Sequence, residues 1–303
     1  MGSLGASQFV DLLVGGIAVG CVYSLVALGF AMIMRATSII HFAQGELMML
    51  GAMCGLTSLW LLPVLPLILV VAVGMVSSGI IAVMMELFVY RTLRRRRVPI
   101  MNIITATVGM SILCINAARL IWGSEPLRFP ELFAATAYEF AGIRISPQLF
   151  WIMVMAVAIM GALQLFLKFT RTGIAMQAVA QDPEAAQLMG ANLTRMMAYT
   201  FAISGMMAGA AGIMLGSMFF AFFEMGFITG LKGFVAATLG GLGSIAGAML
   251  GGILFGLIET FSTVFLSSAY KDAIGMILLI AILLVLPSGL VGLWQRGKTW
   301  RLQ

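Results

Sequence analysis

Residues 64–97 read VLPLILVVAVGMVSSGIIAVMMELFVYRTLRRRR, a long apolar run that ends in a basic run. The first 27 residues hold one charged side chain, Glu86, and the next seven hold five arginines. About 20 apolar residues are enough for a helix to cross a bilayer core of ~30 Å. Arginines beside such a run mark its cytoplasmic end. The stretch therefore predicts a membrane helix that ends in the cytoplasm, with Glu86 paired to the arginines.

The same pattern recurs along the chain. Hydrophobic residues make up 62% of the sequence and charged residues 9%, whereas a soluble domain has roughly 25% charged residues. Apolar runs lie at about 9–34, 38–60, 64–90, 99–122, 149–168, 196–220, 228–243, 245–267 and 272–292. We expect an all-α, polytopic transmembrane helix bundle that forms one domain over residues 1–303.

The orientation follows from the basic residues between the runs. If they lie in the cytoplasm, the C-terminus is cytoplasmic and the segment 228–243 must cross too, which makes nine passages. That segment is short and glycine-rich, and it contains Lys232, so a broken or half-length helix inside the bundle fits it better than a lipid-facing one. The prediction is eight or nine membrane segments, with a re-entrant segment as the alternative. Residues 123–148 are expected to form an ordered loop outside.

Several function classes are disfavoured. The net charge of +6 is spread between apolar runs, which does not suggest nucleic-acid binding. A single histidine and no cluster of Cys or carboxylates predict no metal site. No phosphate-binding glycine loop, catalytic triad or cofactor motif is present, so we expect neither an enzyme nor a cofactor bound by this chain.

Residues 169–195 form the longest connection predicted for the cytoplasmic side. Within it, Asp182 suits a helix N-cap, Pro183 suits the first helical position, and Glu184 complements the N-terminal dipole. Gly190 can take the left-handed conformation that ends a helix. The pattern predicts a rigid helix of about two turns, which is either a solvated loop helix or a helix that docks on a partner.

Several stretches carry a family resemblance. They include Glu184-Ala185-Ala186-x-x-x-Gly190, Ile40-His41-Phe42-Ala43-Gln44-Gly45-Glu46 and Ala237-Thr238-Leu239-Gly240-Gly241-Leu242-Gly243. From about residue 9 to 292 the chain resembles the branched-chain amino acid permeases of ABC importers, the first of their two membrane subunits. One departure is that the family commonly has N-F-A-H-G-E where this chain has H-F-A-Q-G-E.

The resemblance implies a set of partners. The chain would pair with a second homologous permease, two ATP-binding cassette subunits would bind ATP beneath them, and a periplasmic binding protein would deliver substrate. One ATPase subunit would dock on the coupling loop residues Asp182, Glu184, Ala185, Ala186 and Gly190. The implied location is the bacterial inner membrane, and the implied substrate is leucine, isoleucine or valine; related systems carry urea, short amides or aromatic acids.

His41, Gln44 and Glu46 are candidates for the translocation path or gate. His41 is either a packing residue at a helix start or a gate contact. A carboxylate inside a membrane is costly unless it is paired or faces water, so Glu46 either serves transport or accepts backbone N–H bonds at a helix break.

Other features suggest packing. Lys232 and Glu259 fall on neighbouring segments and are predicted to pair across the bundle. Glycines four residues apart let helix backbones approach closely; they include Gly205 and Gly209, and Gly243, Gly247 and Gly251. The rival function is an ion-coupled secondary transporter that works without ATPase subunits and uses Glu46 and Glu259 as coupling carboxylates.

Overall fold

A computed structural model describes residues 6–130, 138–140, 143–265, 270–285 and 289–292. The long helices are α1 (Ala6–Thr37), α2 (Gln44–Leu61), α3 (Leu67–Met85), α5 (Ile100–Trp122), α6 (Pro147–Phe169), α9 (Leu193–Met218), α10 (Met225–Gly240), α11 (Ile245–Phe265) and α12 (Lys271–Val285). A π-helical turn, Glu86–Tyr90, joins α3 to α4 (Arg91–Arg95), and α7 (Arg171–Gln181) and α8 (Pro183–Leu188) connect α6 to α9.

Each predicted apolar run contains a helix, which confirms the all-α membrane bundle. Within the described ranges, seven helical spans are long and apolar enough to cross a membrane. Two of the long helices do not meet this criterion. Helix α2 begins with the polar residues Gln44 and Glu46, and α10 has 16 residues and a length of about 24 Å. The short, buried helix predicted near 228–243 is therefore confirmed.

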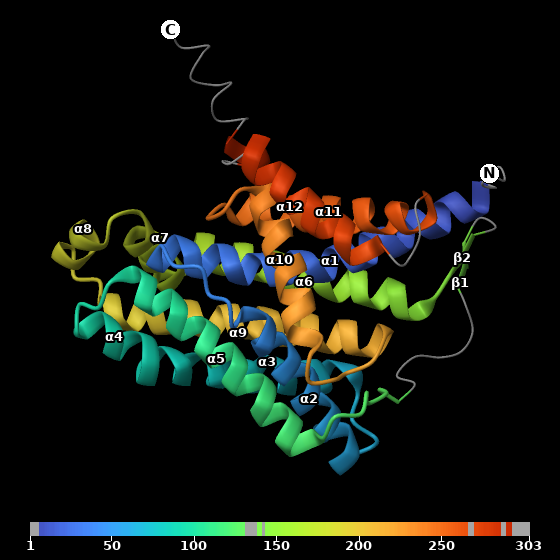
Figure 1. The fold of residues 1–303 in the computed structure, drawn as a ribbon, viewed down its shortest axis with the longest axis horizontal. Coiled ribbons are helices and arrows are strands. Elements are labelled where there is room, and N and C mark those ends of the chain that lie inside the picture. Colours follow the sequence, from blue (N-terminus) through green and yellow to red (C-terminus); the bar gives the residue numbers. More distant parts are fainter. Residues whose placement is uncertain (1–5, 131–137, 141–142, 266–269, 286–288, 293–303) are drawn as a thin grey trace, which may run out of the picture.

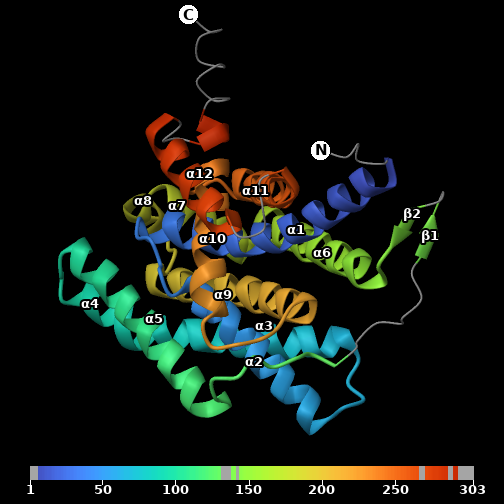
Figure 2. The same ribbon diagram turned by 45° about the vertical axis from the view of Figure 1, so that its right-hand side comes forward.

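Helix α1 lies in the middle of the bundle and is 89% buried along its most apolar window. It packs beside α11 (Figures 1 and 2), where glycines bring the two backbones together. A Cβ on Gly20 would lie 2.8 Å from the Cα of Ile253, and one on Gly256 would lie 2.7 Å from the carbonyl oxygen of Gly16. Only glycine permits this approach, so the backbones of α1 and α11 pack directly against each other.

Helix α10 runs across the long helices instead of along them, as both ribbon views show (Figures 1 and 2). Its first two turns meet the start of α2, where a Cβ on Gly45 would lie 2.8 Å from the Cα of Gly230. Lys232 and most of the second half of the helix are buried. The transverse direction explains how so short a helix can lie inside the bundle.

The connection between α1 and α2 turns back into the bundle. The backbone N–H of Phe42 donates to the Thr107 hydroxyl on α5 at 3.2 Å, and the Gln44 side chain lies against Gly29 of α1. Gly29 is eight residues before the end of α1, about 12 Å along its axis. Helix α2 therefore begins well inside the bundle.

The predicted outer loop, 123–148, includes a short antiparallel pair, β1 (Tyr138–Phe140) and β2 (Ile143–Ile145), whose backbone register pairs Glu139 with Arg144. Leu127 and Ala221 also pair through two backbone hydrogen bonds of 2.8 Å. Residues 131–137 and 141–142 lie outside the described residues. The pair of strands is the one departure from helices among the described elements.

The glycine predictions have two outcomes. Gly205 and Gly209 of α9 face α3, and Gly247 and Gly251 of α11 face α10, each close enough that a Cβ would lie within 3 Å of a neighbouring atom. Gly243 differs, because it lies in the turn between α10 and α11 with a φ of +87°. Glycine is needed there for its left-handed backbone and not for helix packing.

Candidate coupling and translocation sites

The predicted coupling helix is present as α8. The Asp182 carboxylate accepts hydrogen bonds from the backbone N–H groups of Glu184 and Ala185, both at 3.0 Å, so it caps the helix as expected. Gly190 has a φ of +90°, and its N–H donates to the Gln187 carbonyl at 2.9 Å. The Asp182 cap and the left-handed Gly190 thus delimit a helix of about two turns.

The C-terminal end of α8 exposes large apolar side chains. Leu188 and Met189 are each 89% exposed. Ala186 is the buried residue of α8, and together with Ala185 and Ala178 it lines a cavity of about 550 Å³ between α8 and α7. Two large apolar side chains therefore lie exposed where α8 ends.

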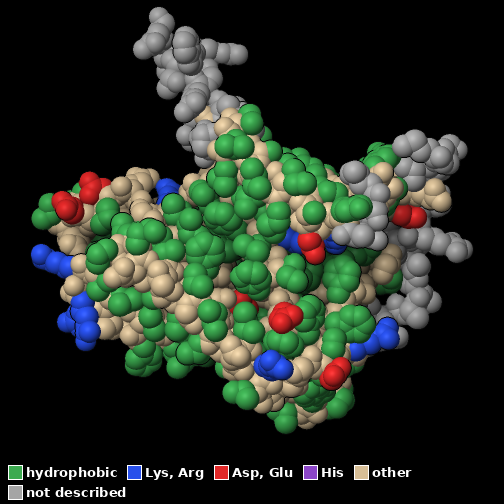
Figure 3. Space-filling view, viewed as in Figure 1, with side chains coloured by type: hydrophobic (Ala, Val, Ile, Leu, Met, Phe, Trp, Pro, Cys, Tyr) green, Lys and Arg blue, Asp and Glu red, His purple; other side chains and the backbone are tan. Residues whose placement is uncertain are grey.

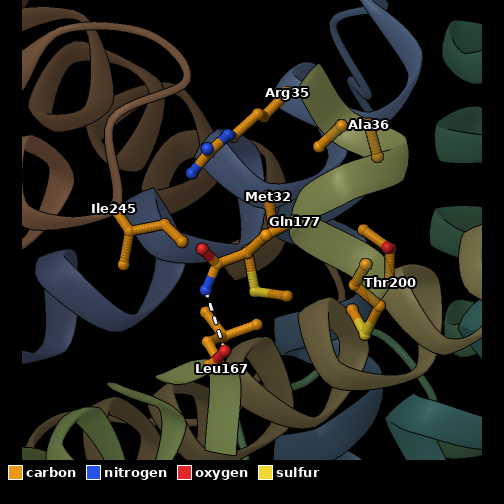
Figure 4. Close-up of a pocket in the computed structure, with 9 residues that line it drawn as sticks. Met32, Arg35, Ala36, Leu167, Gln177, Thr200 and Ile245 are labelled. Atoms are coloured by element: carbon orange, nitrogen blue, oxygen red, sulfur yellow. Dashed lines mark hydrogen bonds between the residues drawn. The ribbon is translucent and has the colours of Figure 1, made fainter. Parts of the chain in front are cut away.

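Helix α7, which the sequence analysis did not foresee, connects α8 to the bundle. The Thr170 hydroxyl caps it by accepting from the Gly173 N–H at 3.0 Å, and the Gln177 amide donates to the Leu167 carbonyl at 2.9 Å (Figure 4). Arg35 reaches into the pocket on the other side of Gln177 (Figure 4). A larger cavity of about 640 Å³ continues from it to Lys168.

Gln44 links three helices. Its amide nitrogen donates to the Ser204 carbonyl on α9 at 3.2 Å, and its amide oxygen accepts from the Ser204 hydroxyl at 3.0 Å. The same hydroxyl also lies 3.1 Å from the Gly29 carbonyl on α1. The side chain is fully buried, so it holds α1, α2 and α9 together.

Glu46, two residues further along α2, is only partly paired. One carboxylate oxygen accepts from the Ser111 hydroxyl on α5 at 2.8 Å. The other oxygen has no hydrogen-bond partner among the described residues and lies against Gly226, in the first turn of α10. Glu46 therefore stands where α2, α5 and the start of α10 meet.

His41 is packed among aromatic rings. Its imidazole centroid lies 5.2 Å from that of Tyr90 and 5.4 Å from that of Phe201, both in edge-to-face geometry. The ring is 1% exposed, and neither nitrogen has a hydrogen-bond partner within the described part of the chain. His41, Gln44 and Glu46 thus meet different neighbours, and their roles in transport remain predictions.

The predicted ion pairs are present. Lys232 on α10 lies 2.7 Å from a carboxylate oxygen of Glu259 on α11. Arg94 forms a bidentate pair with Glu86, as expected from the basic run.

Three further members of the Lys232 cluster, Asp272, Tyr23 and Lys271, were not predicted. The Lys232 ammonium also lies 2.7 Å from Asp272 at the start of α12, and the Tyr23 hydroxyl of α1 donates to Glu259 at 2.7 Å. Lys271 lies 3.8 Å from Glu259. Tyr23 lies within an apolar run that gives no sign of such a partner, and the sequence did not single out Lys271 or Asp272 as partners of Lys232.

A multi-pass bundle of apolar helices with buried, paired charges is that of a polytopic integral membrane protein. Residues 12–283 match the family described as "Branched-chain amino acid transport system / permease component". The chain belongs to this family.

Named relatives agree over nearly the whole chain. The high-affinity branched-chain amino acid transport system permease protein LivH of Escherichia coli is 35% identical over 94% of this chain and 96% of its own length. The corresponding protein BraD of Pseudomonas aeruginosa is 34% identical over the same shares. A probable LivH of Methanocaldococcus jannaschii is 29% identical over 95% of this chain.

Proposed function

We propose that this chain imports branched-chain amino acids as one of two permease subunits of an ATP-driven ABC transporter. The family membership and the names of the relatives support this substrate class. A second homologous permease, two ATP-binding cassette subunits and a periplasmic binding protein complete the assembly. ATP is bound by the partner subunits.

The single observation that carries the coupling role is the exposed apolar tip of α8. Leu188 and Met189 stand almost fully exposed on a helix whose cap and end hold it rigid. Large apolar side chains gathered at an aqueous surface indicate a protein partner. Closure of an ATPase dimer would pull on this tip and move α7 with it.

The direction of the chain in the membrane follows from its basic residues. Arg35, Arg94, Arg95 and Lys168 lie in the last turns of their helices, at the same end of the bundle as α7 and α8. The positive-inside rule makes this the cytoplasmic end. We propose that the C-terminus is cytoplasmic as well, because Arg296, Lys298 and Arg301 follow the last apolar run. We also propose that the membrane is the inner membrane of a bacterium.

The test is the substitution Leu188→Glu in the assembled importer, with Leu188→Met as the matched control. A charge buried in the ATPase groove should lower ATP-driven leucine uptake by about tenfold or more, which requires only ~1.4 kcal/mol at the interface. Co-purification of the ATPase subunits with the permease should fall in parallel. Unchanged uptake and co-purification in Leu188→Glu would show that α8 is not the coupling helix.

The rival, an ion-coupled secondary transporter, is not favoured by any comparison. Its second coupling carboxylate, Glu259, is already held by Lys232 and Tyr23. Leucine uptake by the purified chain alone, driven by a proton or sodium gradient, would support the secondary-transporter hypothesis instead.

A further inference from the structure

The cavity of about 640 Å³ beside Gln177 lies where three candidate membrane spans meet. Helices α1 and α6 end beside it, and α11 begins there. Arg35 lies in the last turn of α1 and Lys168 in the last turn of α6. Figure 3 shows basic side chains at this end of the bundle, where α4 and α8 lie, and hydrophobic ones over the long helices. A basic residue at the end of an apolar span marks the boundary between membrane and water, so the cavity lies at that boundary.

Two cations line this cavity without an anion to balance them. Arg35 and Lys168 both contribute to its wall, and no carboxylate among the described residues does. Neither side chain forms an ion pair within the described part of the chain. The Lys168 ammonium lies 5.3 Å from the ring centre of the neighbouring Phe169, which leaves its charge available at the rim. Two like charges around one cavity attract an anion into it.

The start of α11 adds uncharged donors to the same wall. Ile245 and Ala246 line the cavity, and their backbone N–H groups have no acceptor among the described residues. The next N–H, that of Gly247, donates to the Ser244 hydroxyl at 3.1 Å, which caps the helix. The N-terminus of a helix carries a partial positive charge that favours anions. The helix end therefore strengthens the attraction that the two cations already exert.

Exposed apolar side chains lead away from the cavity along two of its helices. On α6, Leu165 is 60% exposed and lies one turn before Lys168 on the same face. On α11, Leu250 and Leu254 are 59% and 39% exposed, and they follow Ala246 at intervals of four residues. A cationic cavity at the membrane boundary, continued by apolar faces within the membrane, matches a ligand with an anionic head and hydrocarbon chains.

Basic pockets between membrane helices at the cytoplasmic surface bind anionic lipid headgroups. We propose that this cavity binds the phosphate group of an anionic phospholipid from the leaflet on its own side of the membrane. The planar guanidinium of Arg35 donates to two phosphate oxygens at once, and the Lys168 ammonium supplies the second charge. The N–H groups of Ile245 and Ala246 donate to the same phosphate, and the acyl chains lie along the exposed faces of α6 and α11. Such a site does not depend on the proposed function.

The test is a titration of the purified full chain in detergent with phosphatidylglycerol, followed by native mass spectrometry. Arg35→Gln should weaken binding of this lipid about fivefold or more, the usual effect of one cation beside anionic lipid, and Arg35→Lys should restore most of it. Lys168→Gln, on an exposed helix end, should weaken binding as well, so a folding defect in Arg35→Gln does not decide the result. The matched control is Arg195→Gln, which removes an exposed cation at the start of α9, outside the cavity, and should leave the affinity unchanged.

Competition distinguishes the two sources of a phosphate group. Inorganic phosphate should leave the bound phosphatidylglycerol in place, because it gains nothing from the apolar faces; displacement by inorganic phosphate would overturn the lipid assignment. Equal lipid binding by the parent chain, Arg35→Gln and Lys168→Gln would overturn the site itself. The same variants are also made in the assembled importer. Loss of the ATPase subunits there, with lipid binding unchanged, would overturn the proposal too, since the cavity would then bind an acidic side chain of that partner.

Discussion

The substitution Lys232→Met should destabilise the bundle strongly. The Lys232 side chain is 8% exposed and lies 2.7 Å from both Glu259 and Asp272. Without it, the partners that Glu259 keeps among the described residues are the Tyr23 hydroxyl and the more distant Lys271, and its side chain is 1% exposed. Breaking a buried pair by removing one partner costs about 3–5 kcal/mol, because the remaining charge is left uncompensated.

The double substitution Lys232→Met, Glu259→Gln should recover more than half of that loss. The glutamine amide oxygen still accepts from Tyr23, and the Lys232 cluster no longer contains a buried carboxylate. Asp272, which is largely exposed, adds little to the cost. The measurement is unfolding of the purified chain by sodium dodecyl sulfate in mixed micelles, followed by circular dichroism.

Lys168→Met is the matched control, because the Lys168 ammonium lies over the ring of the neighbouring Phe169 on an exposed helix end. It should change the free energy of unfolding by less than about 0.5 kcal/mol, as is usual for surface substitutions. The reasoning is refuted if Lys232→Met is as stable as Lys168→Met, or if the double variant is less stable than the single one.

Three further outcomes follow from the structure. Gly45→Ala should lower the melting temperature, because its Cβ would press on the α10 backbone, whereas Gly109→Ala, with open space around it, should not; a thermal melt of both variants decides this. Asp182→Ala should cost α8 about 1 kcal/mol of helix stability, seen as faster amide hydrogen exchange in residues 184–189, and unchanged exchange would contradict the cap. Gln44→Leu should destabilise the protein by leaving the buried Ser204 hydroxyl with fewer partners, by about 1–3 kcal/mol in detergent unfolding, and a neutral result would remove Gln44 from the core.

Local features of the site were predictable from the sequence because local chemistry determines them. The N-cap at Asp182, the first helical position of Pro183 and the left-handed backbone of Gly190 depend on the chemistry of these residues and not on distant contacts. The pairing of Lys232 with Glu259 was also predictable, since two opposite charges in neighbouring apolar segments have few other partners inside a membrane.

Directions and distant contacts were not predictable in the same way. Nothing in the composition of residues 225–240 indicates that α10 lies across its neighbours, because a helix has the same pattern whichever way it points. The contacts of Tyr23 with Glu259 and of Gln44 with Ser204 join residues more than 150 positions apart. Such contacts depend on packing and leave no mark in the local sequence.

The glycine contact between α1 and α11 bears on how the protein is made. A ribosome completes α1 first, while residue 245, where α11 begins, follows about 200 residues later. Until then the most buried helix of the bundle lacks the α11 backbone that packs against Gly20. The Tyr23 hydroxyl also lacks its hydrogen-bond acceptor, Glu259. The first helix to be synthesised is thus among the last to be fully packed, and nascent chains that stop before α11 lack the surface that would cover it.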